Sequence, residues 1–150
     1  MLAVRSFCYH VCFFCVTLVM AIAGLPLLAG PRRWSRWLGM VWSRAVLWLS
    51  RAIIGLNYRL EGELPDGPVL IVAKHQSAFE TFLFPAIRPD AVFVIKQELL
   101  RLPLVGWYLS RAGQIAIDRS ANTAALRHML AQAKERAGEG LSVVIFPEGT

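Results

Sequence analysis

The stretch Pro68-Val69-Leu70-Ile71-Val72-Ala73-Lys74-His75-Gln76-Ser77-Ala78-Phe79-Glu80 passes from an apolar run through a polar loop into a helical pattern. The apolar run predicts a strand over 68–73, and Ser77 is a good N-cap residue for the helix that follows. This layout puts His75 in the loop and Glu80 in the first turn of the helix. An imidazole held by a carboxylate can take a proton from an alcohol near neutral pH, so the pair is a candidate for acid–base chemistry.

The same residues also have a purely structural interpretation. Ser77-Ala78-Phe79-Glu80 fits a capping box, in which a hydroxyl and a carboxylate satisfy the free backbone N–H groups at the start of a helix. Glu80 is therefore either the partner of His75 in proton transfer or a capping residue. Replacing Glu80 with Gln separates the two interpretations, because Gln still fits a capping box but cannot stabilise a positive imidazole by charge.

Beyond Gly55 the chain alternates short apolar runs with helical stretches. We predict strands over 57–61, 68–73, 91–95, 114–117 and 142–146, and helices over 78–87, 99–111 and 121–137. Such alternation indicates an α/β domain with a mainly parallel sheet. Open sheets of this class bind ligands beyond the carboxyl ends of their strands, so we expect His75, Asp118 and Glu148 at one edge. Because no helix follows the last strand, we expect that strand to be exposed and to lack neighbours.

The first 55 residues form a separate part directed to the membrane. Between Arg5 and Arg32 there is no Asp, Glu, Lys or Arg, and 7–28 is long enough to cross a hydrocarbon core of about 30 Å as a helix. We favour a retained anchor over a cleavable signal peptide, because the apolar run continues to Leu28. The arginines that follow the run predict a cytoplasmic carboxy-terminal side. These are Arg32, Arg33, Arg36, Arg44 and Arg51.

The segment 33–54 carries basic residues at helical spacing among tryptophans. This predicts an amphipathic helix in the headgroup layer, with its arginines reaching lipid phosphates. A second spanning helix is the alternative, but its arginines make a full crossing costly. Apolar residues make up 56% of the chain, more than a soluble domain of this size needs. We therefore assign the formal charge of +6 to contact with anionic membrane lipids and expect no nucleic acid partner.

The cysteines and the remaining histidines carry no predicted chemistry. Cys8, Cys12 and Cys15 fall within the apolar segment, where a zinc site is improbable, and we expect them to face lipid or to pack. No second His or Cys cluster completes a metal site around His75, so we expect no metal. His128 lies in a helical stretch among basic residues and is expected at the surface.

Three segments in this order resemble the glycerolipid acyltransferase family, specifically the 1-acylglycerol-3-phosphate (lysophosphatidate) acyltransferases. They are Lys74–Glu80, Gly113-Gln114-Ile115-Ala116-Ile117-Asp118-Arg119 and Phe146-Pro147-Glu148-Gly149-Thr150, and the resemblance covers roughly residues 58–150. Family members carry Asp where this chain has Glu80, and their third block continues with Arg after the position of Thr150. The resemblance implies an αβ acyltransferase domain over 56–150, truncated after this block, behind a membrane anchor and interfacial helix over 1–55.

The resemblance also implies a reaction and roles for residues. An acyl group would pass from acyl-CoA or acyl-carrier protein to the sn-2 hydroxyl of lysophosphatidate, giving phosphatidate in phospholipid biosynthesis, with no further cofactor. His75 would be the general base, aligned by Glu80, without an acyl-enzyme on Ser77. Substrate would be bound by residues of the later blocks. These are Lys96, Asp118, Arg119, Glu148, Gly149 and Thr150, with Arg119 on the acceptor phosphate.

Two other functions stay open at this point. The acceptor is either lysophosphatidate or another lysolipid, such as a lyso-aminolipid or a lysophospholipid, because the family shares these blocks. A membrane-anchored domain that keeps the fold without turnover is the further alternative. The presence of both His75 and an acid at the expected spacing favours the enzyme.

Overall fold

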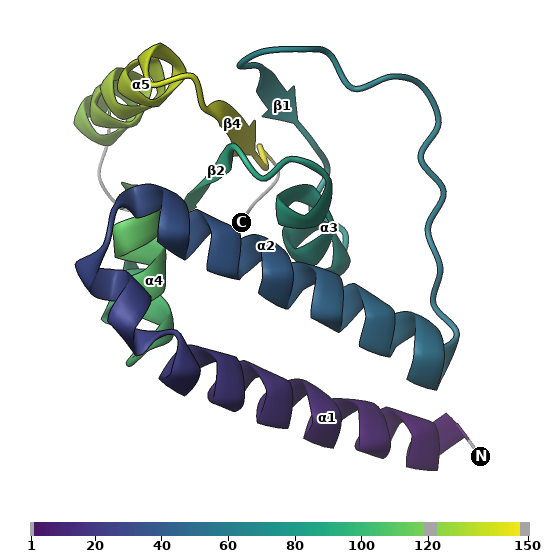
Figure 1. The fold of residues 1–150 in the computed structure, drawn as a ribbon. Coiled ribbons are helices and arrows are strands. Elements are labelled where there is room, and N and C mark those ends of the chain that lie inside the picture. Colours follow the sequence, from purple (N-terminus) through teal and green to yellow (C-terminus); the bar gives the residue numbers. More distant parts are fainter. Residues whose placement is uncertain (1, 119–122, 148–150) are drawn as a thin grey trace.

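The structure is a computed structural model that describes residues 2–118 and 123–147. Its helices are α1 (Leu2–Ala23), η1 (Leu25–Ala29), α2 (Arg32–Leu49), η2 (Ser50–Ile54), α3 (Phe79–Ile87), η3 (Gln97–Arg101), α4 (Val105–Ala112) and α5 (Thr123–Gly138). Its strands are β1 (Leu70–Val72), β2 (Ala91–Lys96), β3 (Ile115–Ile117) and β4 (Ser142–Ile145). The predicted mixed α/β class is confirmed (Figure 1).

The four strands form one parallel sheet in the order β1-β4-β2-β3. The alternating side chains of the strands bury both faces of the sheet. On one face Val92, Ile115 and Val143 pack with Met129 of α5. On the other face Phe93 and Val144 pack with Phe84 of α3. Because all four strands run parallel, their carboxyl ends meet at one edge, as the sequence predicts.

The last strand is the most enclosed element of the sheet, so the expectation that it would be exposed is wrong. β4 lies between β1 and β2 and pairs with both. Its residues Val143 and Val144 are 4% and 0% exposed. Sequence order does not give sheet order, and a strand late in the chain is inserted between two earlier ones.

Two other predicted elements are corrected. Residues 57–61 form no strand and are exposed, and the long connection from α2 to β1 runs apart from the sheet (Figure 1). Their alternating pattern is real, but it meets no partner strand among the described residues. The predicted helix over 99–111 is interrupted between η3 and α4, where Pro103 lacks a backbone donor and Leu104 has a φ of 61°.

α1 is long and apolar enough to cross a membrane, and it is the one such helix among the described residues. It ends at Ala23, before the predicted Leu28, and the 3-10 turn η1, with Pro26 in its first turn, follows from Leu25. α1 runs antiparallel along α2. Trp42 Nε1 donates to Thr17 Oγ1 at 3.0 Å, and Ser50 Oγ donates to Tyr9 Oη at 3.1 Å.

The helix predicted over 33–54 is confirmed as α2 and η2, and two of its arginines bond to carbonyl oxygens of neighbouring helices. Arg36 Nη1 donates to the Ala112 carbonyl at 3.2 Å, and Arg44 Nε donates to the Ala86 carbonyl at 3.3 Å. α2 thus packs against α3 and α4, and contact of the basic residues with lipid headgroups stays a prediction. Periodicity reveals a basic stripe but not the carbonyl oxygens that it meets.

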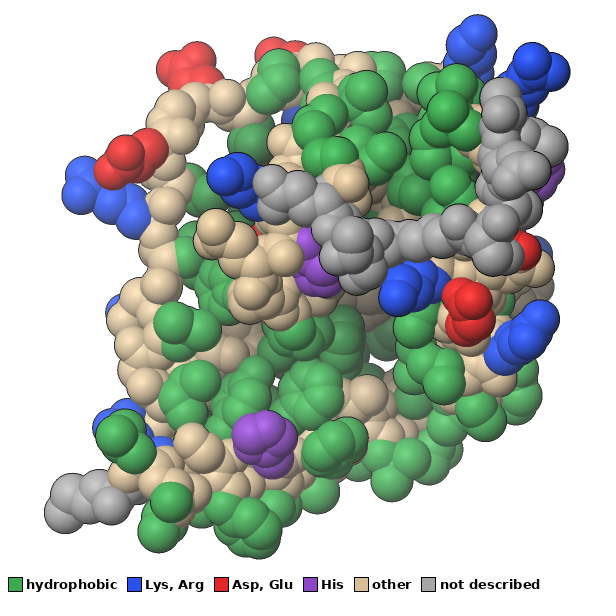
Figure 2. Space-filling view, turned by 180° about the vertical axis from the view of Figure 1, so that it is seen from behind, with side chains coloured by type: hydrophobic (Ala, Val, Ile, Leu, Met, Phe, Trp, Pro, Cys, Tyr) green, Lys and Arg blue, Asp and Glu red, His purple; other side chains and the backbone are tan. Residues whose placement is uncertain are grey.

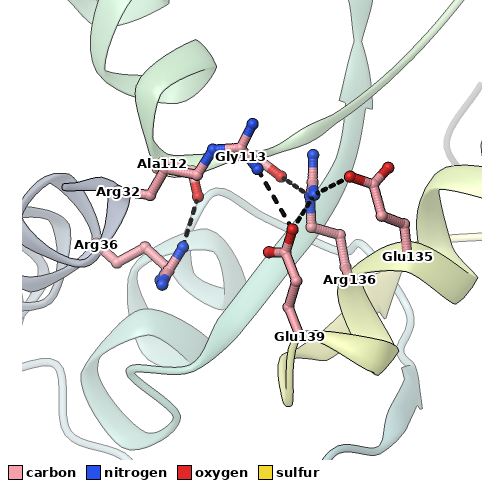
Figure 3. Close-up of polar contacts among 7 residues, drawn as sticks. All are labelled: Arg32, Arg36, Ala112, Gly113, Glu135, Arg136 and Glu139. Carbon is pink, nitrogen blue, oxygen red and sulfur yellow. Dashed lines mark hydrogen bonds and ion pairs between the residues drawn. The ribbon is translucent and has the colours of Figure 1, made fainter.

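A charged cluster joins α2 to α5 and to the turn before β3 (Figure 3). Arg136, whose side chain is 8% exposed, donates from Nε to the Gly113 carbonyl at 3.0 Å. The Glu139 carboxylate lies 2.8 Å from Arg136 Nη1 and 3.6 Å from Arg32 Nη1. Burial lowers the pKa of Arg36; the Glu139 charge opposes this effect and the neighbouring Arg32 and Arg136 add to it. The cluster fixes the sheet relative to α2.

Candidate active site

The candidate site lies at the carboxyl edge of the sheet, where β1 and β4 end. His75 follows β1 after a short loop, and Phe146 directly follows β4. A backbone bond from Ala73 N to the Ile145 carbonyl, 3.1 Å long, continues the β1–β4 pairing up to this point. The sheet itself therefore brings the two ring side chains together.

His75 and Glu80 face each other as the sequence predicts. His75 Nδ1 lies 3.6 Å from Glu80 Oε2. The side chains are 38% and 22% exposed, so the pair is accessible from solvent without being fully hydrated. The separation is an ion-pair distance, slightly longer than a hydrogen bond, and such contacts commonly tighten once substrate is bound.

Glu80 also makes the predicted cap. The backbone N–H of Ser77 donates to Glu80 Oε2 at 3.1 Å, and the backbone N–H of Phe79 donates to Ser77 Oγ at 3.1 Å. The Ser77 hydroxyl lies 3.3 Å from the same carboxylate oxygen. The two interpretations of Glu80 are therefore not exclusive, because the oxygen that caps the helix is the one that faces His75.

The surroundings of Glu80 keep its carboxylate charged. Burial alone would raise the pKa of Glu80, but hydrogen bonds from its own backbone N–H and from the N–H and hydroxyl of Ser77 outweigh burial. Together with the His75 charge they lower the pKa below its ordinary value of 4.5. A charged acid beside Nδ1 favours the ring orientation in which Nε2 is turned away from Glu80.

The ring of Phe146 stacks on the imidazole of His75. The ring centroids are 4.6 Å apart and the planes differ by 27°. Sequence reasoning placed Phe146 in the third block but gave it no role. Its position at the end of a strand was visible in the sequence, whereas the pairing of β4 with β1 that brings it beside His75 was not.

Lys96 and Asp118 lie on the other half of the same edge. Lys96 ends β2 and is in register with Ile117 of β3, and Asp118 follows directly. β1 and β3 are three strand positions apart, a separation of about 14 Å. Asp118 lines a cavity of about 460 Å³ between η3, β3 and α5. His128, expected only at the surface, is exposed but also lines this cavity.

The rest of the predicted site falls outside the described residues. These positions are Arg119, Glu148, Gly149 and Thr150. Within 2–118 and 123–147 no group of three or more His, Cys, Asp or Glu side chains is arranged to hold a metal ion. A second cavity, of about 520 Å³, is lined by Arg32, Trp107 and Arg111, lies beside η1 and α4, and does not include His75 in its lining.

A parallel sheet that presents a His–carboxylate pair at the carboxyl ends of its strands defines an α/β domain equipped for proton transfer. Residues 55–150 match the family model described as Acyltransferase, and the chain belongs to this family.

Relatives named as acyltransferases agree with this assignment. The chain is 40% identical over 111 residues to a 1-acyl-sn-glycerol-3-phosphate acyltransferase of Pseudomonas aeruginosa, covering 73% of this chain and 43% of the relative. It is 35% identical over 105 residues to a lyso-ornithine lipid O-acyltransferase of the same organism, covering 69% of this chain and 40% of the relative. The chain thus spans less than half the length of these two relatives.

The fold is that of the 1-acyl-sn-glycerophosphate (LPA) acyltransferase PlsC from Thermotoga maritima. The TM-score is 0.75 at 22% identity, over 100% of this chain and 63% of that structure.

Proposed function

We propose that the protein containing this chain transfers an acyl group from an acyl thioester to the sn-2 hydroxyl of lysophosphatidate, forming phosphatidate. The observation that carries the proposal is the His75–Glu80 pair at the carboxyl edge of the sheet. The names of the relatives support the choice of acceptor. The donor is acyl-CoA or acyl-carrier protein, and no cofactor is required.

The reaction follows from the orientation of the imidazole. With Nδ1 turned to Glu80, Nε2 accepts the proton of the acceptor hydroxyl as that oxygen attacks the thioester carbonyl. Glu80 stabilises the positive ring that results. When the tetrahedral intermediate collapses, the carbon–sulfur bond breaks and the imidazolium returns its proton to the thiolate. The hydroxyl of Ser77 is engaged with Glu80 and the Phe79 N–H, so it is not the nucleophile.

The acceptor phosphate is assigned to the other half of the edge. Lys96 supplies one positive charge there, and Arg119 supplies the guanidinium that forks onto phosphate oxygens. Asp118 belongs to this half of the edge. Glu148, Gly149 and Thr150, which lie outside the described residues and follow β4 in sequence, are proposed to bind the acceptor as well, with Gly149 allowing close backbone approach. The separation of about 14 Å between β1 and β3 leaves room for a glycerol phosphate between the base and these groups.

The membrane supplies the acceptor. We propose that α1 holds the protein on the bilayer, with the carboxyl edge of the sheet on the cytoplasmic side, where acyl thioesters are available. Figure 2 shows hydrophobic side chains gathered over the lower part of the molecule, where α1 lies in Figure 1. Phe7, Phe14 and Val19 of α1 are each at least 65% exposed, which fits contact with lipid.

The test is an acyl-transfer assay on the full-length protein in membranes. Lysophosphatidate is offered alone and in competition with lyso-ornithine lipid and lysophosphatidylcholine, beside a His75→Ala variant. We expect lysophosphatidate to be acylated fastest and His75→Ala to lose activity. Preferred acylation of lyso-ornithine lipid would favour the second candidate, which the lyso-ornithine lipid relative supports. Full activity of His75→Ala would overturn the mechanism, and absence of turnover on every lysolipid would favour a non-catalytic domain.

A further inference from the structure

The proposed mechanism leaves the contact between Phe146 and His75 without a role. One face of the imidazole is covered by the Phe146 ring, at 4.6 Å between centroids and 27° between planes, while the ring edge at Nδ1 meets Glu80. We propose that Phe146 is a positioning residue that stabilises the positive imidazole formed when the acceptor hydroxyl loses its proton. The inference rests on the proposed acyl transfer and adds a residue to it.

The physical reason is the charge distribution of an aromatic ring. The face of a phenyl ring is negative, and a cation within about 6 Å of its centroid is attracted to it. A neutral imidazole gains much less from the same contact than a positive one. The stabilisation therefore grows as the proton is transferred, and only interactions that strengthen toward the transition state accelerate the reaction.

Phe146 and Glu80 contact the same ring in different ways. Glu80 stabilises the charge at Nδ1, and Phe146 stabilises it from one face of the ring. The two contacts also restrict rotation about the bond that joins the ring to the His75 side chain. Nε2 is thus held in one direction before the acceptor arrives.

The stacking ring is itself rigidly held. Phe146 stacks on Phe93 of β2 with centroids 6.2 Å apart and planes 24° from parallel, and it lies 6.3 Å from the ring of Phe84. Its backbone directly follows β4, which is paired on both sides. A platform fixed by two strands and a helix can hold a catalytic ring more closely than a loop residue can.

The size of the effect follows from the exposure of the pair. His75 is 38% exposed, so the contact falls between a hydrated and a desolvated one. Contacts in this range correspond to a rate factor of about 2- to 30-fold. Phe146 is thus expected to modulate the rate of the chemical step without being essential for it.

The test replaces Phe146 with mono-, di- and trifluorinated phenylalanine in the full-length protein. Fluorine withdraws electron density from the ring face and changes its size little, so packing is kept. We expect the single-turnover rate to fall with each added fluorine, to about one-tenth for the trifluorinated ring, while KM for the lysolipid changes less than twofold. The same series at Phe93, which touches Phe146 but is not stacked on His75, is the control and is expected to leave the rate unchanged.

A second measurement tests the stack without catalysis. The ring current of Phe146 shifts the His75 ring protons upfield in an NMR spectrum, and Phe146→Leu, which keeps an apolar side chain, removes that shift. The inference would be overturned if the single-turnover rate did not change with fluorination of Phe146, or if the His75 protons of the wild type showed no ring-current shift. A rate that falls with fluorination, measured on a lysolipid other than lysophosphatidate, would support the inference and refute the proposed acceptor. A wild-type protein inactive on every lysolipid would overturn both proposals.

Discussion

Glu80 Oε2 accepts the backbone N–H of Ser77 at 3.1 Å, and this same oxygen lies 3.6 Å from His75 Nδ1. A capping bond therefore sets the direction in which the carboxylate faces the imidazole. The start of α3 and the alignment of the base are one arrangement, so a substitution at Glu80 affects both unless it preserves the capping acceptor.

Glu80→Gln preserves the capping acceptor and removes the charge. Its amide oxygen can still accept the Ser77 N–H, so we expect the midpoint of thermal unfolding to change by no more than about 2 °C. The uncharged side chain cannot stabilise a positive imidazole, so turnover of lysophosphatidate should fall about 100-fold or more. Unchanged turnover in this variant would reduce Glu80 to a capping residue.

Glu80→Asp and Glu80→Ala are the matched controls for that substitution. Asp keeps the charge and is the acid usual in the family, but it is one methylene shorter, so we expect partial activity. Ala removes the charge and the cap together. It should lose activity and also about 1 kcal/mol of unfolding free energy, which thermal or denaturant unfolding measures.

The sequence predicted the parts of the fold that depend on local pattern. Apolar runs located β1, β2, β3 and β4, and the Ser77 cap located the start of α3 within two residues. Local pattern could not reveal that β4 enters between β1 and β2, because strand order depends on contacts far apart in the chain. For the same reason the sequence paired His75 with Glu80, five residues on, but gave no role to Phe146, whose place depends on that strand order.

The hydrogen bonds of the buried Arg88 side chain lead to a prediction about stability in acid. Arg88 Nη2 lies 2.6 Å from the Gly67 carbonyl, 2.7 Å from Ser142 Oγ and 3.1 Å from Asp90 Oδ2. Burial alone would raise the pKa of Asp90. Hydrogen bonds from the Ser142 hydroxyl, from the backbone N–H of Asp90 and from Arg88, together with the Arg88 charge, outweigh burial and lower this pKa below 3.8. A carboxyl group whose pKa is lowered by folding stabilises the folded state at pH values above its unfolded pKa. This stabilisation is lost as the pH falls through the pKa of the folded state.

Asp90→Asn is therefore expected to destabilise the protein only where the carboxylate is charged. The side chain is 35% exposed, so after allowance for solvent screening we expect a loss of about 1 kcal/mol at pH 6. The difference from wild type should shrink below pH 3.8, where the unfolded carboxyl is protonated. Denaturant unfolding at several pH values measures both effects.

Glu61→Gln is the control, because the Glu61 side chain is 81% exposed in its pair with Arg59, and it should show neither effect. A loss of unfolding free energy in Asp90→Asn that does not depend on pH would contradict the role given to the Asp90 charge.

The close approach of α4 to η3 requires glycine at position 106. A Cβ placed on Gly106 would lie 2.2 Å from the Leu100 carbonyl oxygen, a backbone atom that cannot move without distorting η3. We expect Gly106→Ala to cost about 1–3 kcal/mol of unfolding free energy. Gly39 lies within α2 with nothing inside 4 Å of its Cβ position. Gly39→Ala should therefore stabilise the helix by about 0.5–1 kcal/mol, and equal effects at both positions would contradict the close approach.

The packing of α1 restricts how it can lie in a membrane. α1 packs along α2 through the bonds Trp42–Thr17 and Ser50–Tyr9, and it also contacts the sheet domain directly. Phe13 of α1 packs against Phe82 of α3, and the Tyr108 hydroxyl of α4 donates to the Ala21 carbonyl at 2.7 Å. If α1 crossed the bilayer upright, α2 would run through the hydrocarbon with it, and the sheet domain packed on α2 would be drawn to the same depth. Burying that much polar surface is prohibitive. We therefore expect α1 to lie along one surface of the bilayer, although its length would allow a crossing.

Single cysteines near the start of α1 and at the end of η1, which follows α1, test this orientation. In a protein with Cys8, Cys12 and Cys15 replaced by Ala, cysteine is introduced in place of Ser6 or of Ala29, both of which are exposed. A maleimide that cannot cross membranes is added either to intact spheroplasts or to inverted vesicles. A helix along the surface exposes both positions to the same side, so both variants should react only in inverted vesicles, where the cytoplasmic face is outward. Labelling of the Ser6→Cys variant in spheroplasts and of the Ala29→Cys variant in inverted vesicles would show that α1 crosses the bilayer.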